Sequence, residues 1–224
     1  MATFIAFDAE TTGLDPRFNE AIELAGVLLH PETFCPTTER LSIKLKIEKP
    51  DRVTPDTLGV YNHYNPEVWA KEALSQAEGW TTFCDWIFRV GQGGADRITL
   101  VGQNIVGFDY PLFSYWTNQF ALKPNVGYHP EDLMHLFFNI KRRLRSKVRK
   151  ANLAEIASFF GIENPQSHSA LDDANTTGAC YALGEAYLDI LVDCGRRPHL
   201  EILGEAWRRI GFPRDPNAVP LPVR

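Results

Sequence analysis

The chain has 224 residues, of which 44% are hydrophobic and 23% charged, and its formal net charge is −5. These numbers exclude a disordered or collagen-like chain and supply enough apolar side chains for a packed core. With no overall positive charge, the sequence argues against a protein that coats nucleic acid in bulk, although a local basic groove is compatible with it.

The four cysteines stand far apart along the chain, at Cys35, Cys84, Cys180 and Cys194. We therefore expect reduced thiols and neither a zinc site nor a disulfide framework. The N-terminus lacks a basic stretch followed by an apolar one, and no apolar run approaches the ~20 residues that a membrane span requires. These features predict a cytoplasmic protein, or a nuclear one in a eukaryote, that makes no contact with a membrane.

Three strands are predicted near the N-terminus, over 3–8, 21–29 and 40–47. The first is apolar on both faces, which is typical of a buried central strand, whereas the third alternates between apolar and polar residues. Because short turns connect the three strands, we expect an antiparallel meander.

Helices and one further strand are predicted after the meander. We expect a helix starting at Thr54, a helix through 80–90, a strand over 98–101, helices over 108–120, 131–148, 152–160 and 170–192, and a short helix near 199–210. This order predicts an α/β layered fold in which helices flank a mixed central β-sheet. We expect a core domain over 1–192 and a C-terminal extension over 193–224 that holds the short helix and a proline-rich tail.

Two acidic residues, Asp8 and Glu10, follow the first apolar run and lead into a Thr-Thr-Gly turn. Because side chains alternate along a strand, both carboxylates point to the same face. Adjacent carboxylates repel each other, and a divalent cation is the usual partner that relieves the repulsion. An EF-hand loop starts with the same spacing, but a strand precedes it here and its twelfth position is Asn19 instead of glutamate.

Two later stretches place further acids at predicted helix starts. In 102–109 a turn bracketed by glycines follows a strand, and Asp109 begins a helix. In 168–174, His168 precedes a helix that starts with Asp172 and Asp173. Taken alone, each acid could be an ordinary first-turn residue that the helix dipole stabilises, and His168 could be a solvated loop residue.

Together, the three stretches resemble the DnaQ-like (DEDDh) 3′→5′ exonuclease family, whose fold is ribonuclease H-like. The family motif Asp-x-Glu-Thr-Thr-Gly matches residues 8–13, Asn-x-x-x-Phe-Asp matches 104–109, and His-x-Ala-x-x-Asp matches 168–173. The resemblance spans roughly residues 3–190. It departs at Gln103, where many members carry histidine, and its spacing selects Asp173 over Asp172 as the ligand.

The resemblance implies hydrolysis of the terminal phosphodiester with two Mg²⁺ ions about 4 Å apart, for which Mn²⁺ would substitute. Asp8 would bridge both ions, Glu10 and Asp173 would complete the site of the ion that activates water, and Asp109 would help to hold the other ion. His168 would be the general base.

The function implied is a metal-dependent 3′→5′ exonuclease that releases nucleoside monophosphates from the 3′ ends of single-stranded DNA. RNA or oligoribonucleotide trimming is an alternative, and so is a proofreading or tethering subunit of a larger complex. A homodimer or a polymerase-type partner stays open on the sequence alone.

Four residues in or directly after the motifs are predicted to contact the substrate: Thr11, Leu14, Asn104 and Phe108. By resemblance, Leu14 would wedge against the terminal base, and its alternative role is to anchor the loop. The aromatic residues Tyr61, His63, Tyr64 and Trp69 could stack on bases, although aromatic side chains more often pack in a core.

Seven of the ten residues in 141–150 are basic, among them Arg142 and Arg145. Beside nuclease motifs, such a run favours a surface that follows the phosphates. A solvated helix face and a nuclear-localisation signal are the alternatives.

Overall fold

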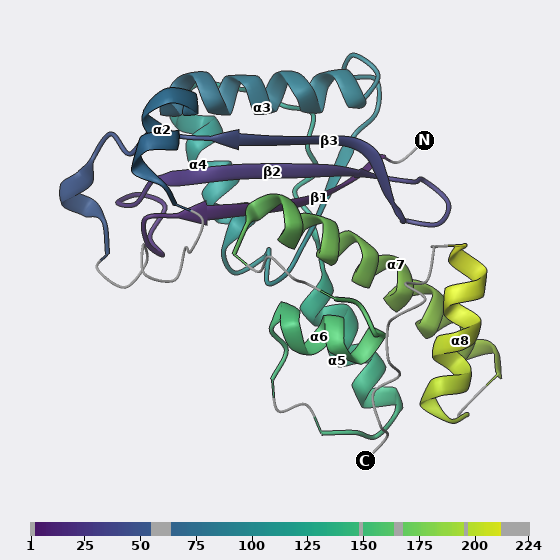
Figure 1. The fold of residues 1–224 in the computed structure, drawn as a ribbon. Coiled ribbons are helices and arrows are strands. Elements are labelled where there is room, and N and C mark those ends of the chain that lie inside the picture. Colours follow the sequence, from purple (N-terminus) through teal and green to yellow (C-terminus); the bar gives the residue numbers. More distant parts are fainter. Residues whose placement is uncertain (1–2, 55–63, 148–149, 164–167, 195–196, 212–224) are drawn as a thin grey trace.

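The computed structural model describes residues 3–54, 64–147, 150–163, 168–194 and 197–211. A mixed five-stranded sheet forms its centre, in the order β3-β2-β1-β4-β5 (Figure 1). The strands are β1 (Thr3–Thr11), β2 (Ala21–Leu29), β3 (Pro36–Lys44), β4 (Ile98–Gly102) and β5 (Glu131–Asp132). The first three strands form the predicted antiparallel meander, and β4 joins β1 in parallel.

Helices lie on both faces of this sheet, as expected for a layered α/β fold (Figure 1). They are α2 (Pro66–Glu72), α3 (Gln76–Val90), α4 (Asp109–Gln119), α5 (Leu133–Arg143), α6 (Leu153–Phe160), α7 (Ala170–Cys194) and α8 (His199–Ile210), with a 3-10 turn η1 (Pro50–Arg52). Among the described residues, no helix is both long and apolar enough to cross a membrane.

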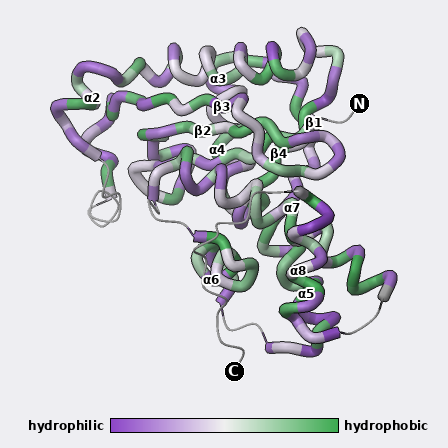
Figure 2. The backbone as a smooth tube through the Cα atoms, turned by 45° about the vertical axis from the view of Figure 1, so that its right-hand side comes forward, coloured by the Kyte–Doolittle hydropathy of each residue, from purple (hydrophilic) through white to green (hydrophobic). Residues whose placement is uncertain are grey.

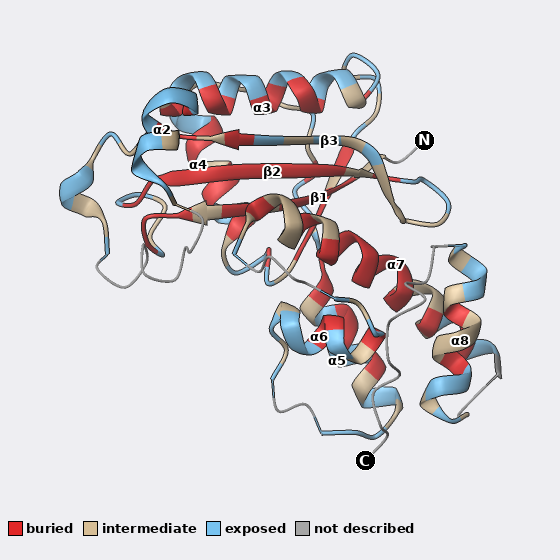
Figure 3. Cartoon of the chain, viewed as in Figure 1, coloured by how far each residue is buried: buried red, intermediate tan, exposed pale blue. Residues whose placement is uncertain are grey.

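The alternation of side chains along β1 divides the core into two layers. Ile5 and Phe7 face α3 and α4, where they pack with aromatic residues such as Phe83 and Phe113. Ala6 faces the opposite side, which α7 covers together with α5, α6 and α8. β2 is buried along almost its whole length, and α3 exposes only its outer side (Figure 3). The hydropathy pattern agrees with this burial, because the outer side of α3 is mostly hydrophilic (Figure 2).

Helix α7 approaches the sheet closely because small residues line its inner side. Ala170, Ala174, Gly178 and Ala182 recur every four residues and are all buried. A Cβ on Gly178 would lie 2.7 Å from Cδ2 of Leu29, so the backbone leaves no room for a larger side chain. The start of α7 is therefore held beside β1, where Asp8 and Glu10 point.

Capping side chains explain where several helices begin. Ser75 and Glu78 form a reciprocal capping box at the start of α3. Asn152 caps α6, which ends at Gly161 in the left-handed conformation. Asp132 caps α5 by accepting a hydrogen bond from the Met134 amide. Each cap satisfies amides that would otherwise lack a partner at the helix start.

Some predicted boundaries were wrong. The helix predicted over 131–148 ends at Arg143, because Leu144 caps it and Arg145 adopts a left-handed backbone with φ 53°. Continuing the helix would stack Arg145 on basic residues three and four positions earlier, which is unfavourable for like charges. The prediction also omitted the short β5 and α2.

The third strand covers Pro36–Lys44 instead of 40–47. Residues 55–63, which hold Tyr61, His63 and the helix predicted to follow Thr54, lie outside the described residues. The proline-rich tail does so too. Trp69 belongs to the core: it is buried and its indole N–H donates to the Ile22 carbonyl. Helix α8 forms as predicted and packs on α7.

Candidate active site

β1 supplies the first pair of carboxylates. Asp8 and Glu10 share the face of Ala6, which is the face that α7 covers. The register between β1 and β2 shifts between Glu10 and Thr11, so a bulge ends the regular pairing directly after the second acid. Bulges of this kind commonly re-aim side chains beside active sites.

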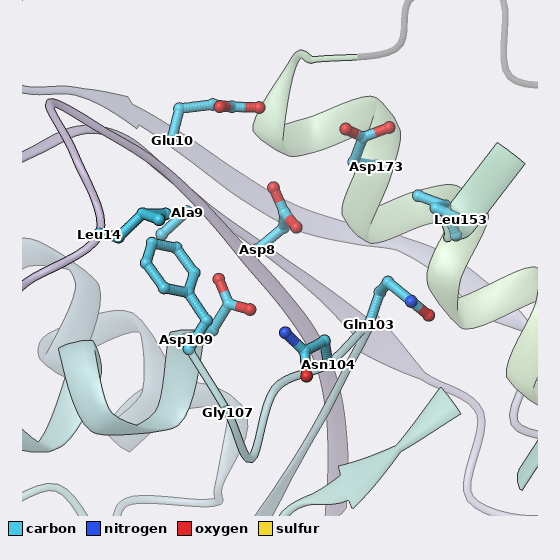
Figure 4. Close-up of a pocket in the computed structure, with 11 residues that line it drawn as sticks. Asp8, Ala9, Glu10, Leu14, Gln103, Asn104, Gly107, Asp109, Leu153 and Asp173 are labelled. Atoms are coloured by element: carbon cyan, nitrogen blue, oxygen red, sulfur yellow. The ribbon is translucent and has the colours of Figure 1, made fainter. Parts of the chain in front are cut away.

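Asp109 and Asp173 reach the same place from two helix starts. Asp109 opens α4 after the turn that follows β4, and it is only 4% exposed. Asp173 lies in the first turn of α7. Because β1 and β4 are parallel, their carboxyl ends meet at one edge of the sheet. Figure 4 shows the carboxylate of Asp8 between Glu10 and Asp173 on one side and Asp109 on the other.

His168 stands beside this group on the loop that precedes α7. Its backbone N–H donates to Oδ2 of Asp173 at 3.0 Å, and its φ of 71° is left-handed. Ligand atoms of Glu10, His168 and Asp173 all lie within 4.8 Å of one another. His168 is exposed to solvent.

The electrostatics of the group favour a bound cation. Burial, first, and then the neighbouring Asp173 and Glu23 raise the pKa of Glu10 to about 7. Burial and nearby carboxylates also raise the pKa of Asp8 well above its ordinary value, with Asp109 the largest charge contribution. The pKa of Asp109 is likewise raised, chiefly by burial. A cation that neutralises these carboxylates would lower all three pKa values.

An open cleft of about 520 Å³ exposes this group. Its lining includes all four acids and three of the predicted substrate-contacting residues: Asp8, Glu10, Asp109, Asp173, Leu14, Asn104 and Phe108. The structure thus brings together nearly all the residues that the motifs single out.

Three predicted substrate residues are outside the lining of the cleft. Thr11 is buried, and its hydroxyl donates to the Gly13 carbonyl, which shapes the turn after β1. Arg142 and Arg145 are exposed at the end of α5. The segment that carries them returns to the cleft, because the Gln103 side chain donates to the Ala151 carbonyl.

Two further buried acids, Glu23 and Asp132, lie next to the site and were missed from the sequence. Glu23 pairs with Glu10 across β1 and β2. Asp132 accepts hydrogen bonds from the amides of Asn104 and Val106. The one signal for Glu23 in the sequence is an acid within an otherwise apolar strand. Asp132 gave no comparable signal.

Solved structures with the same fold include exonucleases. Escherichia coli Exonuclease I in complex with a dT13 oligonucleotide superposes with a TM-score of 0.69 at 17% identity, covering 90% of this chain and 46% of that one. A moderately thermophilic Exonuclease I from Methylocaldum szegediense gives a TM-score of 0.67 at 17% identity, covering 95% of this chain and 45% of that one. The fold is therefore ribonuclease H-like, as predicted.

The family model of the exonucleases, RNase_T, matches residues 5–181. The chain belongs to this exonuclease family, which confirms the DnaQ-like resemblance. Similar proteins include the PolC-type DNA polymerase III of Staphylococcus aureus, 26% identical over 176 residues. That of Staphylococcus epidermidis is 25% identical over 201 residues. The matches cover 79% and 90% of this chain but only 11% and 12% of the polymerases.

Proposed function

We propose that this protein is a metal-dependent 3′→5′ exonuclease that releases nucleoside monophosphates from single-stranded DNA. The observation that carries the proposal is the convergence of four carboxylates in one open cleft, with the exposed His168 close to two of them, Glu10 and Asp173. The chain spans less than half of the Exonuclease I structures, and we propose for it both the direction of cleavage and the substrate.

The donor set fits hard divalent cations. Carboxylate oxygens are the ligands that Mg²⁺ and Mn²⁺ prefer, and a site with only oxygen donors and solvent access suits them. Asp8, Glu10, Asp109 and Asp173 would hold the cations. When bound, a pair of such ions would supply an activated water and stabilise the leaving 3′ oxygen.

His168 would take the proton of the attacking water. Its ring lies close to Glu10 and Asp173, on the solvent side of the carboxylates. Imidazole is the side chain that accepts and releases protons most readily near neutral pH. Exposure would let His168 pass the proton to bulk solvent before the next turnover.

Leu14 and Phe108 would hold the terminal base. Leu14 is 82% exposed in the wall of the cleft, where no core packing accounts for its position. An apolar side chain and an aromatic ring in one cleft offer a stacking site to any base, without reading its sequence. Asn104 supplies polar groups in the same cleft, and Figure 4 shows its amide directed into it.

Arg142 and Arg145 would contact phosphates upstream of the 3′ end. Both are exposed, and the chain runs from them through Ala151, held by Gln103, to Leu153 in the lining of the cleft. A basic approach to an acidic site would compensate the repulsion between the carboxylates and the incoming phosphates.

A proofreading role beside a polymerase is the second candidate, and the similarity to PolC-type polymerases favours it. RNA trimming stays an alternative of the same chemistry. A homodimer and a cytoplasmic location remain predictions from the sequence.

A time course on 5′-labelled oligonucleotides tests the proposal. Single- and double-stranded DNA and RNA of one sequence would be incubated with Mg²⁺, with Mn²⁺ or with a chelator, and the Asp8→Ala variant serves as control. We expect stepwise shortening from the 3′ end, fastest on single-stranded DNA and absent with chelator. Preference for RNA would reassign the substrate, and cleavage that survives the chelator would refute the metal mechanism.

A further inference from the structure

Glu23 and Asp132 are two buried acids whose strands lie on either side of β1 and β4 in the strand order. Each is 6% exposed. Glu23 lies on β2 and Asp132 at the end of β5, and the strand order places β1 and β4 between them. A buried carboxylate is costly unless hydrogen bonds satisfy it, and next to other acids it costs more. The hydrogen bonds of the two carboxylates point to a role that offsets the cost of burying them.

Glu23 joins the start of α7 to the sheet. One of its oxygens accepts from the Ala170 amide at 3.2 Å, and the other accepts from the Ser42 hydroxyl at 2.8 Å. Ala170 is the first residue of α7, two residues after His168 and three before Asp173. The strand partner of Glu23 is Glu10. A single side chain therefore ties the segment of His168 and Asp173 to the position of Glu10.

Asp132 performs the equivalent task for the turn before Asp109. Its Oδ1 accepts from the Asn104 amide at 3.2 Å, and its Oδ2 accepts from the Val106 amide at 3.3 Å. Oδ1 also accepts from the Met134 amide at 2.9 Å, which caps α5. Asn104 has a left-handed φ of 55°. The carboxylate thus holds a turn in which Asn104 adopts the left-handed conformation, one that asparagine tolerates better than most residues.

We propose that Glu23 and Asp132 are positioning residues, which set the distance of α7 and of the Asn104 turn from the carboxylates of β1. This rests on the proposed function, since the positions matter only if the four acids act together.

Glu23 and Asp132 differ in whether an amide side chain can make the hydrogen bonds of the carboxylate. Gln at 23 can still accept from Ala170 and can donate to the Ser42 oxygen. Asn at 132 would turn an N–H₂ group toward one of the backbone amides.

The test compares Glu23→Ala, Glu23→Gln, Asp132→Ala and Asp132→Asn in the full chain. For each variant, kcat and KM on a single-stranded oligonucleotide, the Mn²⁺ affinity by calorimetry and the melting temperature would be measured. Misplacement by about 1 Å can cost on the order of 10²-fold in rate. We expect Glu23→Ala and both Asp132 variants to lose at least about tenfold in kcat and in Mn²⁺ affinity, with KM nearly unchanged. Glu23→Gln should stay within about threefold of wild type.

Glu20→Ala is the matched control. Glu20 is also buried, at 1% exposed. Its carboxylate accepts from the backbone amides of Glu48 and Lys49, and the segment of these two residues holds no residue of the site. We expect this variant to melt at a lower temperature while kcat and Mn²⁺ affinity stay near wild type. If its kcat falls as much as that of Glu23→Ala, the effect is loss of stability and the proposal fails.

Asp132→Asn keeps the shape of the side chain, so it decides the case if an alanine variant does not fold. Wild-type kcat and Mn²⁺ affinity in Asp132→Asn would overturn the role of Asp132, and an inactive Glu23→Gln that still folds would overturn the assigned role of Glu23. Should wild type bind Mn²⁺ without releasing nucleotides, the proposed function fails, and the Mn²⁺ affinities alone then judge the positioning residues.

Discussion

The site has a strand half and a helix half, and they are held in different ways. Asp8 and Glu10 lie on β1, which pairs with β2 on one side and with β4 on the other. His168 and Asp173 lie at the start of α7, where a bond between them and one from Ala170 to Glu23 fix the backbone. Main-chain pairing with β2 holds both acids of the strand half, since the pairing of β1 with β4 covers only Thr3–Ala6. The helix half depends on the close packing of α7 against the sheet and, at its start, on individual side-chain hydrogen bonds.

Removing a carboxylate from either half should have the largest effect. We expect Asp8→Ala and Asp173→Asn to abolish cleavage, because each takes away a ligand that the other acids cannot replace. The fold should survive in both. Without metal, Asp8→Ala should melt at a higher temperature than wild type, because a buried and repelling carboxylate is gone. Gel assays and thermal unfolding with chelator measure both effects, and residual cleavage by Asp8→Ala would remove it from the ligand set.

His168→Ala tests the helix half without touching the carboxylates. We expect the rate to fall by a factor on the order of 10²–10⁴, the usual contribution of a general base. Binding of Mn²⁺ should change little, since the four acids remain. Single-turnover kinetics with saturating metal would measure the rate. Full activity would show that another group accepts the proton, and His168→Gln serves as a control for shape.

The two halves also differ in how far the sequence predicted them. The strand half follows from the apolar run and the spacing of Asp8 and Glu10, because period-two alternation fixes their common face. The position of Asp173 beside these two acids was predicted only from the family resemblance. The physical cause is the row of small residues through Gly178, whose tight fit against Leu29 only the packed structure reveals. The role of Glu23 depends on a hydrogen bond from Ala170, 147 positions away, which no local pattern encodes.

The end of α5 shows the same limit. The apolar spacing over 131–148 continues past Arg143, but repulsion within the basic run and the cap at Leu144 end the helix there. Periodicity marks which side of a helix can pack, whereas charge and capping decide where it stops.

The pH dependence of stability should report the strand half. The folded protein raises the pKa of Glu10 from 4.5 to about 7, so between these values it binds more protons than the unfolded chain. The stability of the metal-free protein is then greatest below about pH 4.5 with respect to this group and falls as the pH rises through 7. We expect a loss of about 1–3 kcal/mol over that window.

Magnesium should reverse this loss at high pH, because it binds the ionised carboxylates of the folded state only. At a hundred times its Kd, a ligand adds about 2.7 kcal/mol of stability. Denaturant titrations at several pH values, with Mg²⁺ and with chelator, would measure both the loss of stability with rising pH and the stabilisation by Mg²⁺. Glu10→Gln is the control and should reduce the slope of the metal-free curve, while Asp8 and Asp109, whose pKa values are also raised, keep part of it. Equal stability with and without Mg²⁺ at pH 8 would contradict the ligand assignment.

The smallest effect is expected outside both halves, on the exposed arginines after α5. Reversing charge at Arg142 and Arg145 should weaken binding of single-stranded DNA by roughly tenfold at low salt and leave kcat unchanged, because neither residue lines the cleft. If each contacts one phosphate, the slope of log K against log salt should flatten by about 1.4. Reversing the exposed Arg40 and Arg208 changes the net charge equally and should leave the slope near wild type. Equal slopes in the two double variants would mean that the basic segment is an ordinary solvated surface.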